Sequence, residues 1–168
     1  MEKGTCKQGV YVRDLIDGRE GLVSGKMYWM FGCEKITVIP KESGNQLILP
    51  NQHEKFIVAE EFLELTGEES KYEKDFSVPN TEKWFGKKCR DKVTGIEGIC
   101  VSCLTNLFSS DLYGLEWRNK KGKSDHQWFD EGRLEIIGDG VTSESVSTHR
   151  PGGSDIELPR ISIPSYSF

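Results

Sequence analysis

Apolar and polar residues alternate in two stretches of the chain, residues 9–23 and 86–101, as half-buried β-strands require. In each stretch two apolar-rich runs flank a dipeptide that ends in glycine, Asp17–Gly18 in the first and Thr94–Gly95 in the second. Glycine adopts a positive φ without a steric penalty, so such a dipeptide is typical of a hairpin turn. Each stretch therefore predicts a β-hairpin.

The second stretch is a copy of the first. With Arg13 aligned on Arg90, an offset of 77 residues, six of the fourteen positions from 9 to 22 are identical. Residues 58–65 match 129–136 at an offset of 71, so the second copy is shorter between these anchors. Self-similarity of this kind indicates an internal duplication, and loops absorb the length difference at little cost.

The remaining pattern predicts a β-rich unit in each copy. Gly21 and Gly98 interrupt the outgoing strands, which indicates a bulge or a close backbone approach, as a sheet that curls into a barrel requires. Further strands are expected near 34–40, 47–49 and 112–119, with a short helical or 3₁₀ turn in 56–65. The predicted fold class is mainly β, with tandem small barrels.

Four segments follow from this pattern. We expect a first barrel repeat at 1–66, a linker at 67–80, a second repeat at 81–140 and a Ser-, Pro- and Gly-rich extended tail at 141–168. Units of about 60 residues are close to the lower limit of independent stability. The two units are therefore expected to pack together or to form a homo-oligomer.

Composition narrows the class of protein. Hydrophobic residues make up 36% and charged residues 29% of the 168, and no apolar run is long enough to span a membrane. No apolar signal sequence follows the polar start, so a cytoplasmic protein is expected. The net charge is −5, which lacks the cationic footprint of nonspecific nucleic-acid binding. This net charge does not exclude a local pocket that binds an anion.

No motif for catalysis or metal binding stands out. Cys100 and Cys103 have the spacing of a metal pair, but in a strand positions i and i+3 face opposite sides, so buried structural thiols are favoured over zinc or redox chemistry. The histidines His53, His126 and His149 form no motif with a nucleophile, and surface or turn roles are favoured. We expect no catalytic residue, metal or cofactor.

The repeated Arg-Asp pairs are candidates for binding. Neighbouring residues of a strand face opposite sides, so one member of Arg13–Asp14 and of Arg90–Asp91 is expected to face inward or toward an interface. An inward arginine needs an anionic partner, either a carboxylate of the fold or a ligand. The aspartates are more simply explained by turn hydrogen bonds than as acid–base pairs with Glu20 or Glu97.

Aromatic and basic side chains supply the other candidates. Tyr28 and Trp29 belong to a segment dense in large apolar residues, which suits a core, a subunit interface or a platform for stacking a base. Trp128 could serve as a second stacking residue. Lys120 lies in a lysine-rich turn, most simply solvated, with phosphate contact as the alternative.

The second unit resembles a widespread set of small bacteriophage proteins. Their pattern is G-x-x-V-x-D-x-x-T-G-F-x-G, a Y/L-x-G-C segment and a closing W-F-D-E-x-x-L. The matching residues are Gly86, Asp91, Thr94, Gly95, Gly98, Gly114, Trp128, Phe129, Asp130, Glu131 and Leu134. Ile96 replaces the usual aromatic, and the first unit has lost the W-F-D part. The resemblance implies SH3- or KOW-like barrels, most of them without an assigned activity, and by analogy of fold a counter-defence role.

These observations favour a non-enzymatic phage counter-defence protein that acts as a sponge for a nucleotide-derived immune signal in the host cytoplasm. In this interpretation Arg13, Arg90 and Lys120 meet phosphates, while Tyr28, Trp29 or Trp128 stack on bases, in a pocket between units or subunits. The alternative is a Tudor- or KOW-like module that binds and blocks a host defence protein. A hydrolase of the same signal is the weakest interpretation.

Overall fold

A computed structural model describes residues 6–41 and 55–146, and the protein in this part is mainly β, as predicted. The first half contains β1 (Tyr11–Asp14), β2 (Glu20–Trp29), β3 (Lys35–Pro40), β4 (Phe56–Val58), the 3₁₀ turn η1 (Glu60–Phe62) and β5 (Leu63–Leu65). The second half contains α1 (Thr81–Trp84), β6 (Lys87–Asp91), β7 (Glu97–Leu104), β8 (Leu112–Arg118), β9 (Ser124–Asp130), η2 (Glu131–Arg133), β10 (Leu134–Asp139) and α2 (Ser143–Val146).

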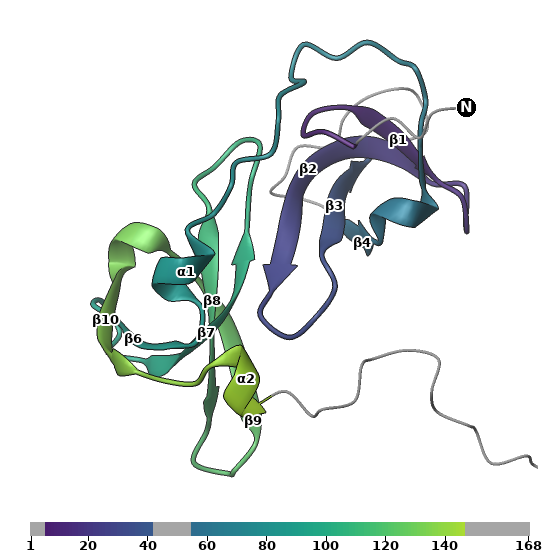
Figure 1. The fold of residues 1–168 in the computed structure, drawn as a ribbon. Helices are drawn as coiled ribbons and strands as arrows, with labels where there is room; N and C mark the ends of the chain where they lie inside the picture. Colours follow the sequence, from purple (N-terminus) through teal and green to yellow (C-terminus); the bar gives the residue numbers. More distant parts are fainter. Residues whose placement is uncertain (1–5, 42–54, 147–168) are drawn as a thin grey trace, which may run out of the picture.

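One ten-stranded antiparallel sheet curls into two lobes, with β1–β5 in one and β6–β10 in the other (Figure 1). Each lobe has one order of pairing: the second strand pairs the first and the third, the third pairs the fourth, and the first pairs the fifth. The predicted strand at 47–49 and the tail beyond residue 146 lie outside the described residues. No helix of the described part is long and apolar enough to cross a membrane.

The register of pairing is also the same in the two lobes. Arg13 lies opposite Glu20 in the first, and Arg90 lies opposite Glu97 in the second. The hairpin glycines Gly18 and Gly95 both have positive φ, at 78° and 75°. Alternation of apolar residues and turn chemistry therefore positioned both hairpins correctly from the sequence.

The lobes meet where the two equivalent strands β2 and β7 pair with each other. Met27 lies opposite Leu104, and hydrogen bonds extend this ladder both ways, from Met30 N to Val101 O and from Leu107 N to Ser24 O. Met27 and Leu104 are themselves 77 residues apart. Equivalent strands thus pair around a local twofold axis, and we call this ladder the seam.

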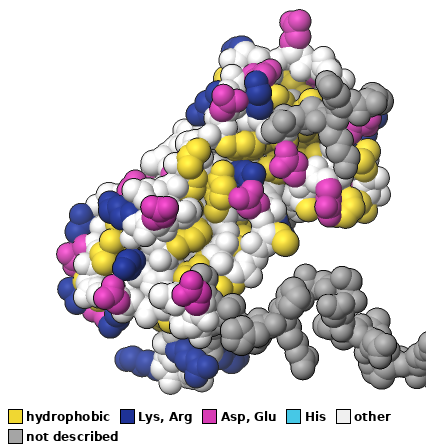
Figure 2. All heavy atoms as spheres, in the orientation of Figure 1, with side chains coloured by type: hydrophobic (Ala, Val, Ile, Leu, Met, Phe, Trp, Pro, Cys, Tyr) yellow, Lys and Arg dark blue, Asp and Glu magenta, His cyan; other side chains and the backbone are white. Residues whose placement is uncertain are grey.

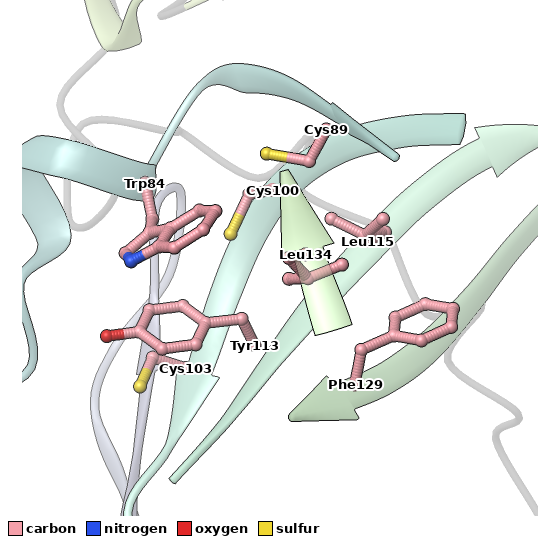
Figure 3. Close-up of a cluster of buried hydrophobic side chains, with 8 residues drawn as sticks. All are labelled: Trp84, Cys89, Cys100, Cys103, Tyr113, Leu115, Phe129 and Leu134. Atoms are coloured by element: carbon pink, nitrogen blue, oxygen red, sulfur yellow. The ribbon is translucent and has the colours of Figure 1, made fainter. Parts of the chain in front are cut away.

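A β-bulge occurs at the same place in each lobe, and it corrects one expectation. The register shifts between Cys100 and Ser102 in β7, as it does between Val23 and Gly25 in β2. The extra residue reverses the alternation, so Cys100 and Cys103 both face the core and not opposite sides. Figure 3 shows the two sulfur atoms on the same side of the sheet, near Trp84 and Tyr113.

Each lobe buries its own apolar cluster. The first cluster contains Cys6, Val12, Val23, Ile36, Val38 and Phe56. The second contains Trp84, Cys89, Cys100, Cys103, Tyr113, Leu115, Phe129 and Leu134 (Figure 3). Burial raises the pKa of the Cys103 thiol to about 12, so this thiol stays protonated at neutral pH. The buried, structural role predicted for the two cysteines is confirmed.

Close backbone approach explains the glycine that interrupts each outgoing strand. A Cβ on Gly21 would lie 2.2 Å from the carbonyl oxygen of Ile39, and one on Gly98 would lie 2.8 Å from that of Glu116. Any side chain at these positions would push neighbouring strands apart. The close approach was predicted; the bulge itself lies a few residues further along the strand.

Candidate functional site

Three aromatic side chains gather on the outer surface beside the seam. The ring centroids of Trp29 and Trp128 lie 6.1 Å apart, those of Trp29 and His126 5.6 Å, and those of His126 and Trp128 4.9 Å. We call these three residues the aromatic platform. The rings touch one another, so a planar ligand would stack on their exposed faces rather than insert between them.

The seam is what builds this platform. The end of β2 passes beyond its own lobe and lies on β7, where Trp29 is opposite Ser102. Residues 126 and 128 of β9 share one face because side chains alternate along a strand. The same alternation sends Tyr28 to the other side, where it packs against the core of the second lobe. The structure therefore brings together Trp29 and Trp128, but it separates Tyr28 from them.

His126 is anchored from below by a buried hydroxyl. Its Nε2 lies 3.0 Å from Ser102 Oγ, and Ser102 is fully buried. Gly114 leaves room for this contact, since a Cβ there would lie 2.0 Å from Ser102 Oγ. Burial lowers the pKa of His126 below its ordinary 6.5, while Glu116 acts in the opposite direction. Neutral imidazole is thus the favoured form at pH 7.

The sequence analysis favoured a surface or turn role for His126 and found no motif with a nucleophile. The side chain of His126 is exposed, as expected, and the sequence did not indicate the hydrogen bond to Ser102. His126 lies within β9, and its partner is 24 residues away in the chain. The pair does not make an accessible nucleophile, because Ser102 Oγ is covered and a substrate carbonyl cannot reach it. The geometry instead holds the imidazole ring in one orientation.

An open groove of about 700 Å³ begins at Trp29 and runs along the second lobe. Its apolar wall includes Met30 and Phe85. Its charged side chains are those of Glu82, Lys87 and Asp139, and Lys87 Nζ lies 3.0 Å from Asp139 Oδ1. The groove thus offers apolar contact next to the platform, and its lysine is neutralised by a carboxylate.

Arg13 and Arg90 face solvent and are paired with carboxylates of the fold. Arg13 Nε donates to Glu20 Oε1 at 2.8 Å, and Arg90 Nε donates to Glu97 Oε1 at 3.0 Å. Arg90 also reaches Glu135. Of the two interpretations left open by the sequence, the structure shows the salt bridge, formed across neighbouring strands rather than inside a core.

The two arginines are also far from the platform and from each other. Arg13 lies opposite Glu20, nine residues from Trp29 along β2, or roughly 30 Å at 3.3 Å per residue. Arg90 lies opposite Glu97, five residues from Ser102 along β7, in the other direction. The structure does not bring them into one pocket with the aromatic residues.

Aspartate is the inward member of each Arg-Asp pair. Asp14 accepts a hydrogen bond from the amide of Ile16, and Asp91 accepts one from the amide of Thr94. Asp91 also receives both forks of Arg133, which lie 2.6 and 2.9 Å from its oxygens. Both aspartates are buried and stabilise the hairpin turn, as predicted.

Lys120 lies at the tip of the β8–β9 hairpin, where the side chain of Asn119 accepts hydrogen bonds from the amides of Lys121 and Lys123. Figure 2 shows Lys and Arg side chains gathered at this end of the molecule. We call Arg118, Lys120, Lys121 and Lys123 the cationic tip. None of these four side chains forms an ion pair with a described carboxylate.

The residues that sequence reasoning missed are Ser102, His126 and Arg118. Alternation in 124–128 places His126 and Trp128 on one face and was a usable signal. The contact with Ser102 and the approach of Trp29 join distant segments, and no local pattern announces them. Among the described residues, no group of His, Cys, Asp and Glu side chains is arranged to hold a metal ion.

The equivalent position in the first lobe carries no aromatic ring. At the same offsets, Asn106 corresponds to Trp29, Lys55 to His126 and Ile57 to Trp128. Lys55 Nζ donates to Asn106 Oδ1 at 3.4 Å, where the second lobe has a ring contact. The local twofold therefore relates two sites, of which one carries the platform.

Comparison of the chain with protein-family models, with curated proteins and with solved structures found no match.

Proposed function

We propose that this protein is a non-catalytic binding protein that holds a nucleotide-type ligand, with a base stacked on the aromatic platform. The observation that carries the proposal is the contact of Trp29, from one lobe, with His126 and Trp128 of the other. Stacking on aromatic side chains contributes about 1–3 kcal/mol per base. A platform fixed by a buried hydroxyl is ordered before the ligand arrives, which reduces the entropic cost of binding.

Phosphates of the ligand would meet the cationic tip rather than Arg13 and Arg90. The tip carries Arg118, Lys120 and two further lysines without carboxylate partners among the described residues, whereas Arg13 and Arg90 are already neutralised. Residues 124 and 128 are four steps apart in β9, or roughly 13 Å. A base on the platform and a phosphate at the tip are therefore separated within one chain.

Sequestration, rather than cleavage, is the mechanism that we propose. The one Ser-His contact of the platform has its hydroxyl buried, which supports binding without bond breaking. Tight stoichiometric binding would lower the free signal below the threshold of its effector. We place this activity in phage counter-defence in the host cytoplasm, on the resemblance of the second unit to small phage proteins.

We further propose that the two lobes descend from one SH3- or KOW-like barrel by duplication. The shared strand pairing, the shared register and the equivalent bulges support this origin. The pairing of equivalent strands around a local twofold axis is what fusion of a symmetric dimer into one chain would leave.

A protein-binding role is the second candidate, because apolar side chains are exposed at equivalent positions in the two lobes. Ile16 is 70% and Val93 72% exposed, and Leu65 is 43% and Ile136 42% exposed. Matching patches of this kind could anchor a host defence protein.

Ligand capture distinguishes these functions. The purified protein is mixed with cyclic dinucleotides and cyclic ADP-ribose-type molecules, washed on a filter and denatured, and the released molecules are identified by mass spectrometry. Intact ligand supports sequestration, altered ligand indicates an enzyme, and no retained ligand favours protein binding.

Matched variants locate the site. Trp128→Ala should weaken capture about 10-fold or more, since one stacking contact is lost. Ile57→Ala, at the equivalent exposed position of the first lobe, should leave it unchanged. Equal loss in the two variants would place the site elsewhere.

A further inference from the structure

The outer edge of β9 is open in the described part of the chain. β9 pairs with β8 alone, in seven consecutive residue pairs without a register shift. By contrast, β10 carries a bulge between Ile136 and Gly138. Bulges, prolines and charged residues, lysine above all, are the usual protection of an edge strand. The sequence of β9, SDHQWFD, has no bulge, proline or lysine, and its charged residues are Asp125 and Asp130.

The platform residues also present their main chain to this edge. Asn119 N donates to Lys123 O, which makes these two a hydrogen-bonded pair. Hydrogen-bonded pairs alternate in an antiparallel ladder, so Asp125, Gln127 and Phe129 direct their amides to β8. The amide and carbonyl groups of Ser124, His126 and Trp128 therefore point outward, where a further strand could pair with them.

Charge along the hairpin is arranged in two blocks. The cationic tip lies at one end. At the other end lie Asp130, which accepts a hydrogen bond from Ser110 Oγ, and Glu131, which also contacts Lys83 and Trp84 of its own chain. The carboxylates of Glu116 and Asp125 lie beside the tip, where they bind Ser124 and Asn119. An antiparallel partner strand of the same sequence would place each tip beside the other's carboxylates.

We propose that the protein forms a twofold dimer by antiparallel pairing of β9 with β9 of a second copy. When the pairing is centred on Gln127, residues whose amide and carbonyl groups point outward lie opposite one another along the whole strand. The same pairing places Lys123 across from Glu131 of the partner subunit. The second copy is favoured over an unrelated peptide because β9 and its flanks are self-complementary in charge.

The dimer also completes the ligand site, an inference that rests on the proposed function. Within one chain the cationic tip lies several residues beyond the platform. In the dimer the partner's Lys123 lies across from Glu131, three residues from Trp128, whereas Lys123 of the same chain is five residues from Trp128. A base held by one chain would then have its phosphates held by the second.

Edge pairing is tested by analytical ultracentrifugation and a matched pair of variants. The molar mass measured for the wild type should be twice that of one chain. Ser124→Pro removes an outward amide that β8 does not use, so it should give a folded monomer. Ser124→Ala loses the same hydroxyl but keeps the amide, and it should remain a dimer. A monomeric wild type, or a dimeric Ser124→Pro variant, would overturn the proposal.

Charge complementarity is tested separately, without ligand. Lys123→Glu should weaken the dimer at least about 10-fold, and combining it with Glu131→Lys should restore most of the loss. Because Glu131 also contacts Lys83 and Trp84 of its own chain, Glu131→Lys alone is the reference for the double variant. A double variant that dimerises no better than either single variant would show that Lys123 and Glu131 of the partner subunit do not face each other.

Ligand capture by these variants separates the two proposals. A folded Ser124→Pro monomer that no longer retains the captured cyclic dinucleotide supports a site shared between subunits. A monomer that retains it fully refutes the shared site and leaves the platform proposal intact. A dimer that captures none of the tested nucleotides refutes the proposed function, and with it the shared site, while edge pairing stands on the mass measurement.

Discussion

Gly114 lies beneath the imidazole of His126, in a space that admits no side chain. In the variant Gly114→Ala the new Cβ would lie 2.0 Å from Ser102 Oγ and 2.3 Å from His126 Nε2. We expect the Ser102–His126 hydrogen bond to break and the free energy of unfolding to fall by about 1–3 kcal/mol. Tryptophan emission should shift to the red as the platform opens, which fluorescence and urea titration would measure.

Gly132→Ala is the matched control for this variant. No atom lies within 4 Å of a Cβ at Gly132, and its φ is not in the left-handed region. Its stability and emission should match those of the wild type. If both alanine variants behaved alike, close packing at Gly114 would not be what orders the platform.

His126 should make stability depend on pH near neutrality. Burial holds its pKa below 6.5 in the folded protein, so the unfolded chain binds a proton first as the pH falls. Stability supported by neutral His126 is therefore present above pH 6.5 and declines as the pH falls below it. The difference in Tm between the wild type and His126→Gln should narrow from pH 7.5 to pH 5.5. A difference that stayed constant would contradict this.

Asp91 and Asp14 allow an internal comparison of equivalent residues. The Arg133 guanidinium, followed by the Thr94 hydroxyl and amide, holds the pKa of Asp91 well below its ordinary 3.8. Phe62 takes the place of Arg133 in the first lobe, so Asp14 lacks this partner. Asp91→Asn should therefore lower Tm by several degrees more than Asp14→Asn, as calorimetry at pH 7 would show.

Acid should reduce the extra stability that the ionised carboxylate of Asp91 provides. A carboxylate with a depressed pKa stabilises the fold above its unfolded pKa, and that contribution is lost as the pH falls below about 4 toward the lower folded value. The Tm gap between the two asparagine variants should narrow over that range. A gap as wide at pH 2 as at pH 7 would indicate that packing, and not charge, separates the two sites.

Residue roles that depend on local geometry were predictable from the sequence. Aspartate in a hairpin turn and glycine at a close approach follow from neighbours a few positions away. For Arg13 and Arg90 the sequence left two partners open, a carboxylate of the fold or a ligand. The contact of the Ser102 hydroxyl with His126 could not be predicted from the sequence. It depends on the bulge that turns Ser102 toward His126, and this bulge depends on how β7 pairs with β8.

At the scale of elements, the seam is the most sensitive feature. A Cβ on Gly25 would lie 1.7 Å from the carbonyl oxygen of Thr105, across the pairing of β2 with β7. Gly25→Ala should therefore separate the strands and cost roughly 3 kcal/mol. Loss of the seam uncouples the lobes, so urea unfolding should change from one transition to two, followed by circular dichroism and by tryptophan emission.

Gly138→Ala provides the control at the same scale. Gly138 lies in β10, away from the seam, and a Cβ there would meet no atom within 4 Å. This variant should unfold in one transition at the wild-type midpoint. A single transition in Gly25→Ala as well would mean that the lobes are coupled by contacts other than the seam.

Strands were predictable because alternation is a local signal, and the seam was not. The density of large apolar residues at 26–33 indicated an interface without saying which strand would cover it. The error at Cys100 and Cys103 has the same origin, since an unbroken strand was assumed where a bulge occurs. Local pattern thus gave the elements, while long-range pairing decided which of their faces meet.

For the whole molecule, the local twofold axis predicts how many ligands bind. Two equivalent positions flank the seam, but the first lobe has Asn106, Lys55 and Ile57 where the second has three aromatic rings. A base gains stacking energy at the second position alone. On the proposed function, titration calorimetry with a cyclic dinucleotide identified by capture should give one site per chain, in a monomer or in a dimer. Trp29→Ala should abolish that single site. Two sites per chain of similar affinity would show that the seam itself, and not the platform, provides binding.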